Sequence, residues 1–199
     1  MQPKTLLQMA GVNPAPSKIA DAAIVVIDAQ REYIDGALPL VGIKPALDEI
    51  GRLLGRARKA GSPVIHVVHV GRPGGAFGPG SPGAEIAAPA TPIEGETIVP
   101  KKLPNAFAGT DLAERLNALG RQEIILVGFQ THMCIEATAR AALDLGFKAT
   151  VVAAATATRD LPDAIGGNAL SAAEVQRNAL AAIADRFATV TPTTSAIPD

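Results

Sequence analysis

Three side chains that could carry out acyl-transfer chemistry follow apolar runs of the sequence. Asp28 ends the run AAIVVID, Lys101 follows the short run TIVP, and Cys134 comes shortly after EIILVGF as the only cysteine of the chain. A thiol must lose its proton before it attacks a carbonyl carbon, and it needs a nearby base or positive charge to do so. The carboxylate of Asp28 could accept that proton, and the ammonium group of Lys101 could stabilise the thiolate. These residue types together indicate a thiol nucleophile.

Each of the three residues also has an ordinary structural explanation. A lone cysteine is usually a small buried apolar residue, an aspartate after a strand often stabilises a turn, and paired lysines such as Lys101 and Lys102 are usually solvated. Their common placement after predicted strands favours a catalytic role, because ligands of open α/β sheets bind beyond the carboxyl ends of the strands. In addition, a helix that begins near His132 would surround Cys134 with free backbone N–H groups, which stabilise a thiolate and an oxyanion alike.

The elements that would position these residues are predicted from hydrophobic patterning. Near-continuous apolar, β-branched runs are typical of strands buried on both faces of a parallel sheet. These predicted strands cover residues 22–28, 63–70, 123–129 and 148–155, with shorter candidates near Ile98 and Val190. The predicted helices that alternate with them cover residues 45–60, 111–119, 133–145 and 172–185. This alternation predicts an α/β fold with three layers, α/β/α, around a doubly wound, mostly parallel sheet.

The chain of 199 residues fits a single domain, which we expect over residues 22–191. Residues 1–21 form a predicted N-terminal arm, and residues 192–199 form a predicted C-terminal tail. The segment GRPGGAFGPGSPG, residues 71–83, is too long and too rich in glycine and proline for a plain connection. We therefore expect it to be a loop that covers a pocket.

Composition argues against several classes of function. The 18 Lys and Arg residues against 19 Asp and Glu give a net charge of −1, with no basic stripe for nucleic acid. No apolar run reaches the ~18 residues of a membrane span. One cysteine forms no internal disulfide, so we expect a cytoplasmic protein without membrane partners. Apolar side chains in the arm predict a homodimer or higher homo-oligomer; they are Leu6, Leu7, Met9, Val12 and Ile19.

Three blocks in order, AIVVIDAQREY, VPKKLPNAFAGTDL and GFQTHMCIEATARAALDLGF, carry a family resemblance between about Ala22 and Asp163. They resemble the isochorismatase-like cysteine hydrolases, which include nicotinamidases and N-carbamoylsarcosine amidohydrolases. In the family's lysine block, the lysine stands six positions before the phenylalanine of AF-x-GT-x-L, and this spacing selects Lys101 over Lys102. The third block, with Gly-x-x-Thr-x-x-Cys, is the most specific.

The resemblance implies the isochorismatase-like fold and a cofactor-independent hydrolase that cleaves an amide-type carbon–nitrogen bond of a small molecule through a thioester. It implies that Asp28 takes the thiol proton, Lys101 stabilises the charged pair and Cys134 attacks. It also implies a cis peptide bond between Phe129 and Gln130. The backbone N–H groups of Gln130 and Cys134 would then form the oxyanion hole.

The chain departs from metal-dependent relatives. Those relatives have an Asp-x-His motif and a later histidine, whereas this chain offers His66 and His69 with no acid between Glu49 and Glu85. Two histidines three positions apart on a strand point to opposite faces, so we expect no metal site. Two alternatives remain open. One is vinyl-ether hydrolysis of the isochorismatase type, which needs no cysteine, and the other is a non-catalytic pocket or oligomeric module on the same fold.

The walls of the pocket are harder to predict, and the sequence leaves the substrate open. Five residues are expected to contact a small-molecule substrate because they lie close to the three blocks or in the glycine-rich loop; they are Gln30, Tyr33, Phe77, Phe107 and His132. Core packing is the alternative for Phe107, and exposure to solvent is the alternative for His132.

Overall fold

Six strands form one fully parallel sheet in the computed structural model, which describes residues 2–199. In chain order they are β1 (Ala22–Ile27), β2 (Val64–His69), β3 (Thr97–Lys101), β4 (Glu123–Phe129), β5 (Lys148–Ala157) and β6 (Thr189–Thr191). Their order in the sheet is β3-β2-β1-β4-β5-β6. The chain therefore winds outward from β1 to one edge and then from β4 to the other, which confirms the predicted doubly wound fold.

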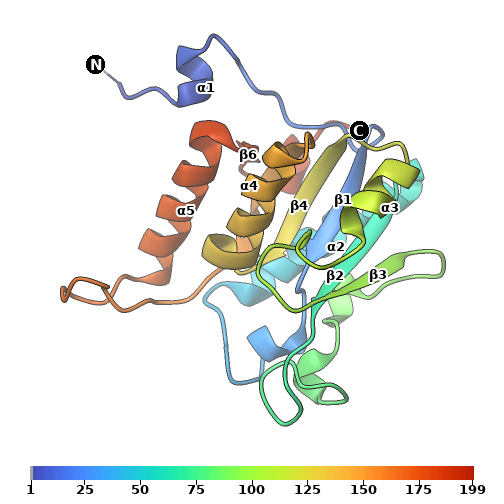
Figure 1. Ribbon diagram of the computed structural model, residues 1–199, viewed down its shortest axis with the longest axis vertical. Coiled ribbons are helices and arrows are strands. Elements are labelled where there is room, and N and C mark those ends of the chain that lie inside the picture. Colours follow the sequence, from blue (N-terminus) through green and yellow to red (C-terminus); the bar gives the residue numbers. More distant parts are fainter. Residues whose placement is uncertain (1) are drawn as a thin grey trace.

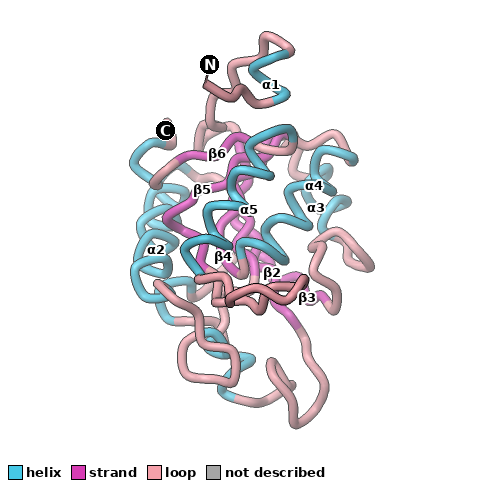
Figure 2. Tube along the Cα trace, turned by 90° about the vertical axis from the view of Figure 1, so that its left-hand side faces the viewer, coloured by secondary structure: helices cyan, strands magenta, loops and turns pink. Residues whose placement is uncertain are grey.

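Helices cover both faces of the sheet (Figures 1 and 2). The helices are α1 (Leu6–Met9), α2 (Ile43–Ala60), α3 (Leu112–Ala118), α4 (Glu136–Asp144) and α5 (Ala172–Arg186). Shorter helical turns are η1 (Arg31–Tyr33), η2 (Pro82–Ala84), η3 (Ala88–Ala90), η4 (Thr131–Ile135) and η5 (Thr194–Ala196). Figure 2 shows α2 on one side of the sheet and α3, α4 and α5 on the other, which gives the three expected layers. Among the described residues, no helix is both long and apolar enough to cross a membrane.

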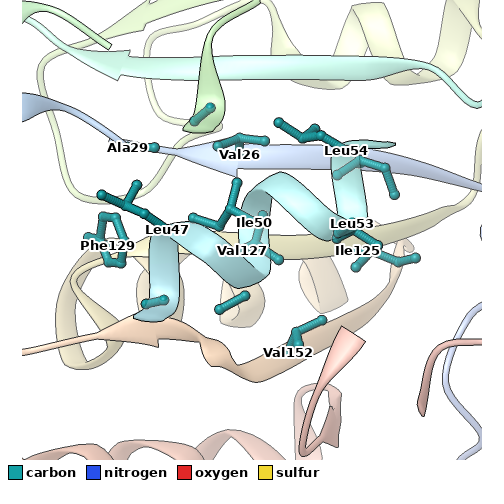
Figure 3. Packing of buried hydrophobic residues seen from close by; sticks show 14 of the residues in the cluster. Val26, Ala29, Leu47, Ile50, Leu53, Leu54, Ile125, Val127, Phe129 and Val152 are labelled. Carbon is teal, nitrogen blue, oxygen red and sulfur yellow. The ribbon is translucent and has the colours of Figure 1, made fainter. Parts of the chain in front are cut away.

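The core beneath α2 forms because the apolar stripe of this helix meets alternate residues of the central strands (Figure 3). The labelled members of this cluster are Val26, Ala29, Leu47, Ile50, Leu53, Leu54, Ile125, Val127, Phe129 and Val152. The intervening strand residues, among them Val25, Ile27 and Leu126, pack on the opposite face with α3, α4 and α5. Because both faces are buried, the strands read as continuous apolar runs in the sequence.

The segment that carries Cys134 differs from the predicted helix over residues 133–145. A wider π turn, η4, comes first, and the regular α-helix α4 begins only at Glu136. Strand β5 is also longer than expected and contains a bulge, because Leu126 of β4 pairs with Val151 while Gly128 pairs with Thr156. The bulge lets the end of β5 run beside the π turn.

The arm and the tail both contact the domain, although Met1 lies outside the described residues. Ile19 and Ile197 are buried members of the core beneath α2, and the Ile19 N–H donates to the carbonyl of Pro198. Further out, α1 lies against α5, where the Leu6 N–H donates to Asp185. Apolar side chains remain exposed on this outer part; they are Leu6, Met9 and Val12.

We predict that Gly128→Ala strongly destabilises the fold. Gly128 has φ of +118°, and an added Cβ would lie 1.9 Å from the carbonyl oxygen of Ile27 in the neighbouring strand. Strain and overlap should lower the free energy of unfolding by at least about 3 kcal/mol, measured by urea denaturation. The control is Gly55→Ala in α2, where the added Cβ meets nothing within 4 Å. The free energy of unfolding of that variant should rise by about 0.5–1 kcal/mol. Equal changes at the two positions would contradict the strain and overlap expected at Gly128.

Candidate active site

The three residues with expected chemistry lie at the carboxyl edge of the sheet. Asp28 directly follows β1, Lys101 ends β3, and Cys134 lies in η4 after β4. The winding of the sheet reverses between β1 and β4, and this crevice is the usual ligand site of open α/β sheets. Asp28 has φ of +49°, a left-handed conformation that aspartate tolerates better than most residues, and its N–H donates to the carbonyl of Val67.

The ammonium group of Lys101 joins the other two side chains. Its Nζ lies 2.7 Å from Oδ2 of Asp28 and 3.4 Å from Sγ of Cys134. The side chains of Asp28 and Lys101 are fully buried, and Cys134 is only 5% exposed. A buried charge is tolerated only when an opposite charge and hydrogen bonds compensate it. The ion pair therefore keeps a carboxylate and an ammonium group beside the thiol without water.

Burial determines the protonation state of this group. Burial, and after it the negative charge of Asp28, raises the pKa of the Cys134 thiol to about 12, although Lys101 acts in the opposite direction. Burial likewise raises the pKa of Asp28, against the lowering effects of Lys101 and of the thiol. The resting thiol is therefore protonated at neutral pH, and the raised pKa makes Asp28 a stronger base than an exposed aspartate.

The backbone around Cys134 is irregular. The peptide bond between Phe129 and Gln130 is cis. The carbonyl of Gln130 accepts the N–H groups of Met133 at 3.1 Å and of Ile135 at 3.2 Å, and the N–H of Cys134 takes no part in this pair of bonds. Within residues 2–199 the N–H of Gln130, which precedes η4, has no hydrogen-bond acceptor. An unpaired N–H group at this place is suited to a developing oxyanion.

The thiol faces a small cavity of about 220 Å³. Its walls are mostly apolar, with a cation at one side; the lining residues are Asp28, Tyr33, Leu38, His69, Phe77, Pro104, Gln130, Met133, Cys134 and Arg159. A larger cavity of about 740 Å³ adjoins it, because Leu38, His69 and Phe77 line both. The glycine-rich loop forms much of the outer cavity, from Gly71 to Phe77. A small substrate could therefore enter through the outer cavity and react in the inner one.

The wall formed by Phe77 is held by a buried glutamate. Phe77 has φ of +54°, an unusual conformation for a bulky residue, and it is nevertheless buried. The carboxylate of Glu32 accepts the N–H groups of Phe77 at 3.3 Å and of Ala37 at 2.6 Å. It also lies so close to Gly83 that an added Cβ there would be 2.2 Å from Oε2 of Glu32. Glu32 thus ties the middle of the loop, at Phe77, to the segment after β1.

Two of the expected pocket residues, Tyr33 and Phe77, line the inner cavity, and three others lie outside its lining. The Gln30 amide bonds to backbone groups of His69 and Ala84, so it braces the loop. Phe107 stacks on Phe147 with ring centroids 5.6 Å apart. The ring of His132 bonds through Nδ1 to the hydroxyl of Thr158 at 2.6 Å. The partners of Gln30 and His132 were not evident from their positions in the sequence, whereas packing was the stated alternative for Phe107.

Arg159 is a cavity residue that the sequence analysis missed. It lies two residues beyond the end of β5, on the same edge of the sheet as the thiol. Its Nε is buried without a hydrogen-bond partner in the part of the chain that the structure describes, and its Nη1 donates to the carbonyl of Asp160 at 3.3 Å. Its place just after a strand end was a usable signal, the same one that pointed to Asp28.

The two histidines considered as metal ligands have separate surroundings. Nε2 of His66 lies 2.9 Å from Glu96, which also pairs with Arg58, whereas His69 lines the inner cavity. Burial is the largest influence on the pKa of each histidine, and it lowers both values. Within the described residues, no three or more His, Cys, Asp and Glu side chains are grouped so as to hold a metal ion.

We predict opposite shifts of the thiol pKa in two variants. In Asp28→Asn the pKa of Cys134 should fall, because a negative charge that disfavours the thiolate is removed while Lys101 remains. In Lys101→Met it should rise, because the favourable positive charge is lost. The ultraviolet absorbance of the thiolate, recorded against pH, measures both shifts. The exposed Asp35→Asn is the control and should leave the titration in place; a higher thiol pKa in Asp28→Asn would contradict the proposed electrostatics.

Comparison with known proteins agrees with the fold and the motifs. Residues 22–195 match the Isochorismatase domain family. A secreted isochorismatase effector of Verticillium dahliae is 40% identical over 92% of this chain and 93% of its own length. A crystal structure of an isochorismatase from Pseudomonas putida KT2440 has a TM-score of 0.93 and 40% identity, and the match covers 98% of this chain and 100% of that one. A maleamate amidohydrolase of Pseudomonas putida is 31% identical over 65% of this chain and 69% of its own length. The chain belongs to the isochorismatase family of hydrolases.

Proposed function

We propose that the protein is an amidohydrolase that uses Cys134 as its nucleophile. The observation that carries this proposal is the contact of one buried ammonium group with both a carboxylate and a thiol, at 2.7 and 3.4 Å. A structural cysteine needs neither group beside it, and a buried ion pair without a task is expensive to maintain. The maleamate amidohydrolase among the relatives acts on an amide, in agreement with this chemistry.

The reaction follows from the positions of the charges. As Sγ of Cys134 bonds to the carbonyl carbon, Asp28 accepts the thiol proton, and the N–H groups of Gln130 and Cys134 bind the oxyanion. The tetrahedral intermediate collapses with cleavage of the carbon–nitrogen bond, and Asp28 returns its proton to the departing ammonia or amine. A water molecule then gives a proton to Asp28 and attacks the thioester. Collapse of this second intermediate expels the thiolate, which takes the proton back from Asp28, and the carboxylic acid leaves and ionises to a carboxylate. The ammonium group of Lys101 lies beside the anionic groups at each stage.

The inner cavity also suggests a class of substrate. Asp28 and Lys101 neutralise each other, so the guanidinium of Arg159 contributes the uncompensated charge of the cavity lining. A guanidinium with a free, buried Nε is suited to a carboxylate. We therefore propose a small amide that carries a carboxylate away from the reacting carbonyl. Maleamate, the substrate in the name of one relative, is an amide of this kind.

The proposed nucleophile is tested by trapping the acyl-enzyme. With p-nitrophenyl acetate as the probe, mass spectrometry should show one acetyl group on Cys134. Cys134→Ser and Asp28→Asn should lower the turnover of a panel of primary amides by at least about 10³-fold, because each removes a reacting group. Lys102→Ala, next to the buried lysine, should keep full activity. Hydrolysis of isochorismate by Cys134→Ala would favour the vinyl-ether reaction instead.

The role of Arg159 is tested by comparing two substrates of similar size. Arg159→Gln should raise the KM for succinamate at least about tenfold and leave kcat/KM for butyramide within about twofold, because only the first carries a carboxylate. In Arg159→Lys the KM for succinamate should lie between the values of the wild type and of Arg159→Gln, since lysine keeps the charge but loses the forked geometry. The exposed Arg177→Gln serves as the control. The carboxylate proposal would be wrong if Arg159→Gln affected both substrates equally.

A further inference from the structure

A glutamine of α5 contacts the segment that carries the nucleophile. Oε1 of Gln176 accepts a hydrogen bond from the hydroxyl of Thr131 at 2.5 Å. Its Nε2 donates to the hydroxyl of Thr156 at 2.8 Å, and that hydroxyl donates in turn to the carbonyl of Ala153 at 2.9 Å. The hydrogen bonds therefore run in one direction from the π turn, through Gln176, into the bulge of β5.

Thr131 is the residue through which this series of hydrogen bonds could affect the proposed oxyanion hole. It is the first residue of η4, it follows Gln130 directly, and it is completely buried. Its hydroxyl also lies 3.1 Å from the carbonyl of Ala157 at the end of β5. One hydroxyl has one proton to share between these two acceptors, so the short bond to Gln176 draws the turn toward α5. The amide of Gln176 thereby links η4 to α5.

The activation of the thiol depends on different elements. Asp28 and Lys101 reach Cys134 from β1 and β3, and neither contacts Thr131 or Gln176 among the hydrogen bonds and ion pairs of the described residues. A change at Gln176 would therefore act on the backbone at Thr131, next to the N–H of Gln130, and leave the base and the ammonium group in place.

We propose that Gln176 is a positioning residue that aligns the oxyanion-binding N–H groups of Gln130 and Cys134 through Thr131. This proposal rests on the thiol acylation proposed above. It predicts that Gln176 affects reactions that form an oxyanion and does not affect reactions of the thiol that form none.

Two probes separate these effects. Acylation by p-nitrophenyl acetate passes through an oxyanion, whereas alkylation by iodoacetamide displaces iodide at a saturated carbon. In Gln176→Leu, acylation of Cys134 should slow by about tenfold or more, while alkylation at about pH 9 stays within about twofold of the wild-type rate. The adjacent, exposed Arg177→Gln is the matched control and should change neither rate.

A second variant makes the test independent of how well Gln176→Leu folds. Thr131→Val keeps the side-chain volume and removes the hydroxyl, so it should slow acylation to a similar extent, and the double variant should be no slower than either single one. Unchanged acylation, equal loss of both reactions, or additive effects in the double variant would each overturn the positioning role. If the wild-type protein itself were not acylated on Cys134, the proposed function would fail instead.

Discussion

The buried ion pair between Asp28 and Lys101 is the constraint on which the architecture of the site depends. Both side chains are completely buried 2.7 Å apart, so neither charge is stabilised by water. Loss of one partner from such a pair typically costs about 3–5 kcal/mol, because the other charge is left buried and uncompensated. The fold must therefore deliver both groups to one place, and it does so by ending β1 and β3 at the same edge of the sheet. The contact of Lys101 with Cys134 then depends on how the chain continues after β4.

The backbone after β4 faces a second constraint. An oxyanion hole needs N–H groups that the protein itself leaves unbonded, yet buried N–H groups without partners are costly. At the π turn the carbonyl of Gln130 accepts the N–H groups of Met133 and Ile135, and among the described residues the N–H of Gln130 has no acceptor. The bulge in β5 supports the arrangement by placing Ala157 and Thr158 beside Thr131 and His132. Irregular backbone is thus concentrated where the proposed chemistry needs it.

The regular part of the fold was predictable because each central strand is buried on both faces. Continuous apolar runs such as AAIVVI and EIILVGF mark such strands without any tertiary information. Asp28, Lys101 and Cys134 could be expected at one edge for the same reason, since each follows or ends a strand. The place of Arg159 just after a strand end was a usable signal, whereas the π turn, the bulge of β5 and the contacts of Gln176 were not predictable. Each depends on which distant segments meet, as Gln30 illustrates by bonding to the backbone of His69 and Ala84.

For the proposed substrate, the distribution of charge in the inner cavity bears on both binding and product release. Asp28 and Lys101 compensate each other, so Arg159 makes the cavity attractive to an anion. Hydrolysis of an amide adds a second carboxylate to such a substrate, and this new charge arises next to Asp28. Two carboxylates at close range repel each other strongly in a dry site. The proposed substrate, an amide with one remote carboxylate, would bind as a monoanion, whereas its hydrolysis would leave a dianion with the new carboxylate next to Asp28, and repulsion between these two carboxylates would favour release of the product.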